Sequence, residues 1–209
     1  PALDFTGKVG TNPYAKAHFY LMSPSGPALN ASASFRWTDR NQFKLGTSDY
    51  KIAYFNVREE IFLSNIKWRK FDMRAGLRNN FFKLNSAMTD QVNGDYDFGN
   101  LTNDYLSVFG TMNADTFDDG YFPTKGFSLG IGYEWVFKGV KHSIDPFHAV
   151  NVDFKSVMQK GCFAWLPSVS ARYMFGGDPP LPYLNLMGGA IAGRYLDQQI
   201  PFMGINYAA

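Results

Sequence analysis

Apolar and polar residues alternate one by one along most of this 209-residue chain. The clearest case is 127–138, where Phe, Leu, Ile, Tyr and Trp alternate with Ser, Gly and Glu. Successive side chains of a strand point to opposite faces of a sheet, so the pattern predicts strands with one apolar and one polar face. It predicts further strands over 29–37, 70–78, 106–115, 150–159 and 168–175, with weaker candidates over 14–22, 42–52 and 54–64.

Turn-forming residues separate these segments, as at 23–27, 93–95, 118–120 and 176–180. Ser86–Gln91 is a candidate for a short helical turn, and no longer helical stripe is evident. The longest stretch without Asp, Glu, Lys or Arg, residues 17–35, contains a Ser-Pro-Ser-Gly-Pro turn, which excludes a membrane-spanning helix. We therefore expect an all-β chain that forms one domain over residues 1–209.

The length of the predicted strands favours a membrane barrel. Residues 126–139 would extend roughly 45 Å at about 3.4 Å per residue, which crosses a bilayer even at a tilt of about 40°. Outer-membrane barrels place aromatic rings at the lipid interface, near strand ends. Such rings occur here at Phe35, Trp37, Trp135, Phe137, Tyr173 and Phe175. A soluble sandwich or ligand-binding barrel shows the same alternation with its apolar face inward, but the mixed charged and glycine positions here suit a wet lumen.

Composition limits the chemistry. The 20 Lys and Arg against 18 Asp and Glu give a net charge of +2, too balanced for a general nucleic-acid binder. A single cysteine, Cys162, excludes an intrachain disulfide framework and a cysteine-based zinc site. His18, His142 and His148 show no metal-ligand spacing, and no nucleophile elbow or phosphate-binding glycine loop is present. We expect no cofactor, no metal and no catalytic site.

A short motif precedes the longest alternating strand. Its residues are Asp118, Gly120, Tyr121, Phe122, Pro123, Thr124 and Gly126, in the pattern D-x-G-Y-F-P-T-x-G. The acidic pair and glycine suit a polar turn, and Pro123 suits the start of a strand because proline cannot donate to a ladder. The motif resembles the signature of the BamA-type superfamily of outer-membrane barrels, the bacterial surface antigen family. That family includes outer-membrane assembly proteins, two-partner secretion transporters and the barrels of some patatin-like phospholipases.

A second resemblance lies downstream, where residues 181–189 are similar to the segment that leads into the family's sixth extracellular loop. Gly188 and Gly189 match its glycine pair, and Arg194 follows five positions after the second glycine, like the family's V-R-G-F/Y arginine. Gly193 and Tyr195 flank it, so the glycine precedes the arginine instead of following it. The resemblance implies a loop near 186–199 inserted in the lumen, with Arg194 paired to an acidic residue, because an unpaired guanidinium there would be costly.

The resemblance also implies the size of the barrel. Family barrels have 16 strands and need roughly 350 residues at about 20–25 residues per strand and connection. We therefore expect this chain to form part of a transmembrane β-barrel, with about 8 to 10 strands. Gly126, Gly130 and Gly132, with Ser128, leave one strand face nearly bare. That face either receives the inserted loop or merely permits curvature of the sheet.

The expected function is that of an integral outer-membrane barrel in a Gram-negative bacterium. It would act in protein insertion or translocation, or anchor a patatin-like phospholipase whose catalytic domain precedes Pro1; residues 194–202 look most like the patatin-linked barrels. Expected partners are outer-membrane lipid and lipopolysaccharide, with other outer-membrane proteins or a second barrel chain as further candidates, and no nucleic acid. A porin-like diffusion channel and a soluble lipid-binding barrel are the alternatives.

Overall fold

A computed structural model describes residues 1–209 apart from 11–12, 22–25, 46–47, 90–101 and 185–209. Its elements are β1 (Ala2–Lys8), β2 (Tyr14–Leu21), β3 (Ala28–Leu45), β4 (Ser48–Trp68), β5 (Phe71–Thr89), β6 (Asn103–Asp115), β7 (Lys125–Gly139), β8 (Phe147–Lys160), β9 (Phe163–Trp165), β10 (Ser168–Gly176) and the 3₁₀ helix η2 (Leu181–Tyr183).

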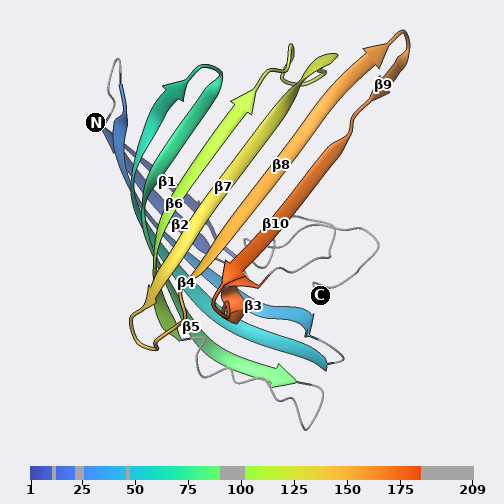
Figure 1. Ribbon diagram of the computed structural model, residues 1–209. Helices are drawn as coiled ribbons and strands as arrows, with labels where there is room; N and C mark the ends of the chain where they lie inside the picture. The colour runs from blue at the N-terminus through green and yellow to red at the C-terminus, as the bar shows by residue number, and fades with distance from the viewer. Residues whose placement is uncertain (11–12, 22–25, 46–47, 90–101, 185–209) are drawn as a thin grey trace.

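The strands form one antiparallel sheet of ten strands, ordered as in the sequence from β1 to β8. Both β9 and β10 pair with β8, so they continue one another along the same edge. Figure 1 shows a strongly curved sheet of steeply inclined strands. The sheet is not closed within the described residues, as expected for part of a barrel. No helix in the described part of the chain is long and apolar enough to span a membrane.

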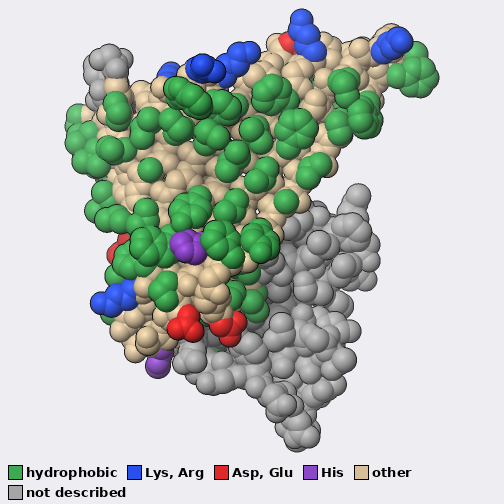
Figure 2. Space-filling model, in the orientation of Figure 1, with side chains coloured by type: hydrophobic (Ala, Val, Ile, Leu, Met, Phe, Trp, Pro, Cys, Tyr) green, Lys and Arg blue, Asp and Glu red, His purple; other side chains and the backbone are tan. Residues whose placement is uncertain are grey.

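The apolar face of the sheet points outward. Ile61, Leu77 and Val169 are each about 60% exposed, and Trp135 is 40% exposed. Glu134, the neighbour of Trp135, points to the opposite face, where it pairs with Arg78. Figure 2 shows the outward apolar side chains as a broad band, with Lys and Arg along one edge. An apolar exterior around a charged interior is the arrangement of a membrane barrel, and it is the reverse of a soluble one.

The structure corrects three details of the predicted strands. The expected strand over 42–52 is the end of β3 and the start of β4, because the chain reverses between the paired residues Leu45 and Ser48. The expected helical turn is wrong over its described residues 86–89, which continue β5 and pair with β4. Pairing to an existing strand decides both cases, and local sequence does not report it. The pattern also missed β1 and β9.

The inner face is less wet than its polar positions predict. Large side chains are packed there beside the charged ones, and the most buried are Phe62, Phe82, Tyr105, Phe109, Phe147 and Tyr183. Tyr105 and Phe147 have no exposed surface, and Phe109 is 2% exposed. This aromatic packing surrounds the polar network described next.

Candidate functional site

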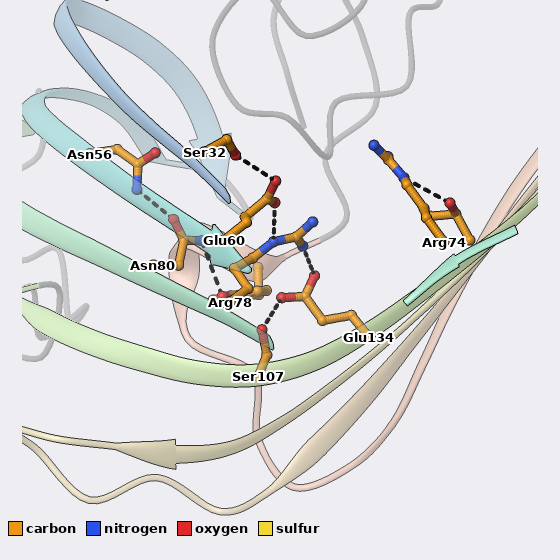
Figure 3. A network of polar contacts seen from close by, with 10 residues as sticks. Ser32, Asn56, Glu60, Arg74, Arg78, Asn80, Ser107 and Glu134 are labelled. Atoms are coloured by element: carbon orange, nitrogen blue, oxygen red, sulfur yellow. Dashed lines mark hydrogen bonds and ion pairs between the residues drawn. The ribbon is translucent and has the colours of Figure 1, made fainter. Parts of the chain in front are cut away.

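An ion-pair network lies at the centre of the inner wall, around Arg78 of β5 (Figure 3). The Arg78 Nε is 2.7 Å from Oε1 of Glu60 on β4, and its Nη1 is 2.7 Å from Oε2 of Glu134 on β7. The three side chains are 14%, 13% and 15% exposed. One guanidinium therefore holds two nearly buried carboxylates from different strands, and short charge-assisted hydrogen bonds of this kind are the strong ones.

Strand register brings these residues together. Arg78 lies directly opposite Glu60 in the β4–β5 pair and opposite Ser107 in the β5–β6 pair. The Ser107 hydroxyl donates to Glu134 Oε1 at 2.7 Å, and the Ser32 hydroxyl of β3 donates to Glu60 Oε2 at 3.3 Å. The network thus links β3 to β7 across the curve of the wall. It fixes the relative positions of these strands from the inside.

Aromatic rings shield the network from water. The Arg78 guanidinium lies 4.4 Å from the ring centroid of Phe109, a cation–π contact that is stronger where the ring is buried. The neighbouring Phe62 ring has room because Gly76 has no side chain. A Cβ at Gly76 would lie 2.4 Å from the Cβ of Phe62. Gly76 is therefore needed for this packing.

The chain after β10 returns to the inner wall at Tyr183 of η2. The Tyr183 ring is 1% exposed and packs edge-on against Tyr105 and Phe147, with centroids 5.4 and 5.1 Å away. Its hydroxyl accepts a hydrogen bond from Asn80 Nδ2 at 3.1 Å, and Asn80 Oδ1 accepts one from Asn56 at 2.7 Å. The segment that follows the last described strand is thereby anchored inside the curve of the sheet.

The signature motif folds as a self-contained turn between β6 and β7. Asp118 Oδ2 accepts a hydrogen bond from the Thr124 hydroxyl at 2.6 Å, and its Oδ1 accepts from the backbone N–H groups of Thr124 and Lys125 at 2.9 and 3.2 Å. These donors, the Thr124 hydroxyl foremost, lower the pKa of the Asp118 carboxyl to about 2. Asp118 and Thr124 thus act as a pair that closes the turn.

The other motif residues make local contacts within the turn or are exposed on its surface. Asp119 Oδ1 accepts from the N–H groups of Tyr121 and Phe122 at 2.7 and 2.9 Å, which lowers the pKa of Asp119. Both aromatic side chains project outward, 91% and 86% exposed. Pro123 precedes the strand, and nothing lies within 4 Å of a Cβ built on Gly120. In the described structure the motif is a hydrogen-bonded turn that exposes two aromatic rings.

Replacing Gly126 with alanine should destabilise the turn where the same change at Gly120 does not. Gly126 has a φ of +115°, and an added Cβ would lie 2.4 Å from the carbonyl oxygen of Thr116. We expect Gly126→Ala to cost about 1–3 kcal/mol, as strained backbone positions do, and Gly120→Ala to stay within about 0.5 kcal/mol. Urea unfolding in lipid vesicles, followed by tryptophan fluorescence, measures both. Equal costs would contradict this account of the motif.

The glycine-bare face of β7 is partly explained by a neighbour. A Cβ on Gly132 would lie 2.8 Å from Cγ of Asn151, the residue opposite it on β8, so Gly132 makes room for that amide. A Cβ on Gly130 would lie 3.3 Å from Oδ1 of Asn113, a tight contact that this flexible side chain could relieve with a small shift. Whether an inserted loop also contacts this face stays a prediction. The loop-motif residues Gly188, Gly189, Gly193, Arg194 and Tyr195 lie outside the described residues.

Sequence reasoning did not single out the residues at the centre of the network. Arg78 and Glu134 fall on predicted polar faces, but nothing in the alternation indicates that they meet across 56 positions of sequence. The same holds for Tyr183, which lies within the segment that resembles the lead into the loop. The available signal was chemical: opposite charges at inward positions of neighbouring strands need partners.

A curved antiparallel sheet with a lipid-facing exterior and an ion-paired interior is the wall of a transmembrane β-barrel. A family model described as the OMP85 superfamily matches residues 28–208, and the chain belongs to this superfamily. Membership confirms the superfamily that the signature turn indicates, and it places the chain in a bacterial outer membrane. No curated protein matches the chain at a significant level. The closer likeness to patatin-linked barrels stays a prediction.

Proposed function

We propose that this barrel inserts or translocates polypeptide at the outer membrane of a Gram-negative bacterium, with its interior occupied by its own chain. The observation that carries the proposal is the docking of Tyr183 on the inner wall. A barrel whose interior is filled by its own chain does not serve bulk diffusion. The barrel wall and the segment after β10 are then available to contact a polypeptide.

A general diffusion channel is the less favoured alternative. Such a channel needs an open lumen lined by hydrated charge. Here the carboxylates of Glu60 and Glu134 are neutralised by Arg78 and shielded by Phe109. The inner wall at this level therefore offers packed surface in place of hydrated charge.

A second candidate is the anchor of a patatin-like phospholipase, favoured by the resemblance of residues 194–202 to patatin-linked barrels. These residues lie outside the described part of the chain. An anchor would need a stable barrel with a closed interior, which the same inner-wall contacts support. It would not need to act on other proteins.

Vesicle reconstitution separates these functions. The folded protein is placed in lipid vesicles, an unfolded outer-membrane β-barrel protein is added, and its folding is followed by the gel-mobility shift of folded barrels. We expect faster folding than in empty vesicles or in vesicles that carry a general porin, together with low ion flux. Low ion flux without faster folding of the added barrel would favour the anchor function. A large steady ion flux would contradict both the insertion function and the anchor function.

A further inference from the structure

A carboxylate stands on the lipid-facing side of the wall. Glu59 of β4 alternates with the inward Arg58 and Glu60, and it lies opposite Ala33 of β3 and Asn79 of β5. Asn79 Nδ2 donates a hydrogen bond to Glu59 Oε2 at 3.2 Å, which fills one of the carboxylate's roughly four acceptor sites. An ionisable side chain facing hydrocarbon is costly, so its presence there points to a function.

The depth of Glu59 is set by an aromatic cluster on the same outer face. Phe55 packs against Phe35, Trp37 and Phe81, with ring centroids 6.0, 6.4 and 5.6 Å away. Rings gathered in this way mark the lipid interface. Phe55 is four residues from Glu59, about 14 Å along a tilted strand. At a tilt of about 40°, the Glu59 backbone lies about 10 Å deeper than Phe55, on the acyl-chain side of the interface.

An apolar groove opens beside Glu59. It is an open groove of about 610 Å³ that is lined in part by small side chains. Its lining includes Leu3, Ala17, Phe19, Ala33, Ile61 and Leu77, from strands β1 to β5. A groove of this size is within the range of small-molecule sites. Its lining suits acyl chains, with hydrogen-bond acceptors at one end.

Cations contact the aromatic cluster. Lys83 is directly opposite Phe55, with its Nζ 5.7 Å from that ring centroid. Lys141 Nζ lies 4.3 Å from the ring centroid of Phe81 and 4.0 Å from Oδ2 of Asp104, and its side chain is 48% exposed. The outer face thus offers cations beside the aromatic rings and, deeper in the membrane, an apolar groove whose lining includes Glu59 and Asn79.

The end of the wall that carries Lys83 and Lys141 has the longest connections. Thirteen residues join β5 to β6 and seven join β7 to β8 there, although two join β3 to β4. At the other end two residues close the hairpins at Arg69–Lys70 and Gly161–Cys162, and the signature turn has nine. Outer-membrane barrels have short turns on the periplasmic side and longer loops outside the cell. The groove therefore belongs to the outer leaflet.

We propose that this groove binds an anionic lipid whose acyl chains are attached through amide and hydroxyl groups, as in the lipid A part of lipopolysaccharide. Amide N–H and hydroxyl groups donate to Glu59 and phosphates meet Lys83 and Lys141, whereas the ester linkages of a diacyl phospholipid offer acceptors alone. A second copy docked about a two-fold axis here would set one Glu59 against another, which like charge disfavours. The proposal rests on the outer-membrane placement, not on polypeptide handling.

Lipid retention measured by native mass spectrometry tests the site. The folded protein in detergent is titrated with lipid A and, separately, with dipalmitoyl phosphatidylglycerol, an anionic lipid with ester-linked chains. We expect binding of lipid A to be tighter on the order of tenfold, since hydrogen bonds to a charged group are worth about that much. Glu59→Leu should remove most of this preference. The Lys83→Gln and Lys141→Gln double variant should weaken the binding of both lipids.

Control variants distinguish the loss of lipid recognition from effects on folding and on net charge. The Lys70→Gln and Lys160→Gln double variant makes the same charge change at the opposite rim, where both lysines are exposed, and should leave lipid A binding unchanged. Heat-dependent gel mobility shows that each variant is folded, and Glu59→Leu only replaces a lipid-facing charge with an apolar side chain. Equal affinity for the two lipids, an unaltered preference in Glu59→Leu, or a dimer lost in that variant would each overturn the proposal. Failure of the polypeptide-insertion assay would not affect it.

Discussion

Replacing Arg78 with methionine should lower the free energy of unfolding by about 3 kcal/mol, since removing one partner leaves buried charges uncompensated. Both Glu60 and Glu134 lose their cation, and each retains a serine hydroxyl as the hydrogen-bond partner described above. Methionine keeps most of the side-chain volume beside Phe109, so the loss measures charge more than packing. Urea unfolding in lipid vesicles gives the value.

Two comparisons make this test specific. Arg74→Met removes the same charge from the same face of β5, where Arg74 is exposed and donates to Thr111 at 2.8 Å; we expect a cost below about 1 kcal/mol. Adding Glu60→Gln and Glu134→Gln to Arg78→Met should restore most of the stability, because the two carboxylates that lost their cation are then uncharged. An equal loss in the Arg74 variant, or no recovery in the triple variant, would contradict the role assigned to the network.

The sequence predicts the faces of the sheet well, because strand alternation needs no knowledge of tertiary structure. Trp135 outward and Glu134 inward follow directly from their parity in β7. The alternation of inward and outward residues breaks down at β-bulges. The β4–β5 register shifts between Leu63 and Ile66, with Asn65 at a φ of 57°, and alternation read from one strand does not reveal such an inserted residue.

The sequence could not predict the inner-wall network for a related reason. Arg78, Glu60 and Glu134 meet because the registers of three strand pairs align them, and each register depends on pairing across the sheet. The same applies to Phe62, whose inward ring is possible because Gly76 lies opposite it. By contrast, the turn at Asp118–Gly126 was predictable as a turn, since its hydrogen bonds are local.

Truncating Tyr183 to alanine should release the segment after β10 from the inner wall. The ring is almost fully buried and its hydroxyl accepts from Asn80, so the change removes both packing and a hydrogen bond. We expect a loss of about 3–5 kcal/mol in the docking of this segment, as for other large-to-alanine changes in packed sites. If the segment occupies the interior, ion conductance across planar bilayers should rise in the variant.

Tyr121→Ala is the matched control, since that tyrosine is 91% exposed in the signature turn. It should leave both stability and conductance unchanged. Tyr183→Phe separates the two contributions, because it keeps the ring against Tyr105 and Phe147 and leaves the buried amide of Asn80 without this acceptor, at about 1–3 kcal/mol. Conductance that stays at the parent level in Tyr183→Ala, despite lowered stability, would mean that Tyr183 braces the wall without closing the interior.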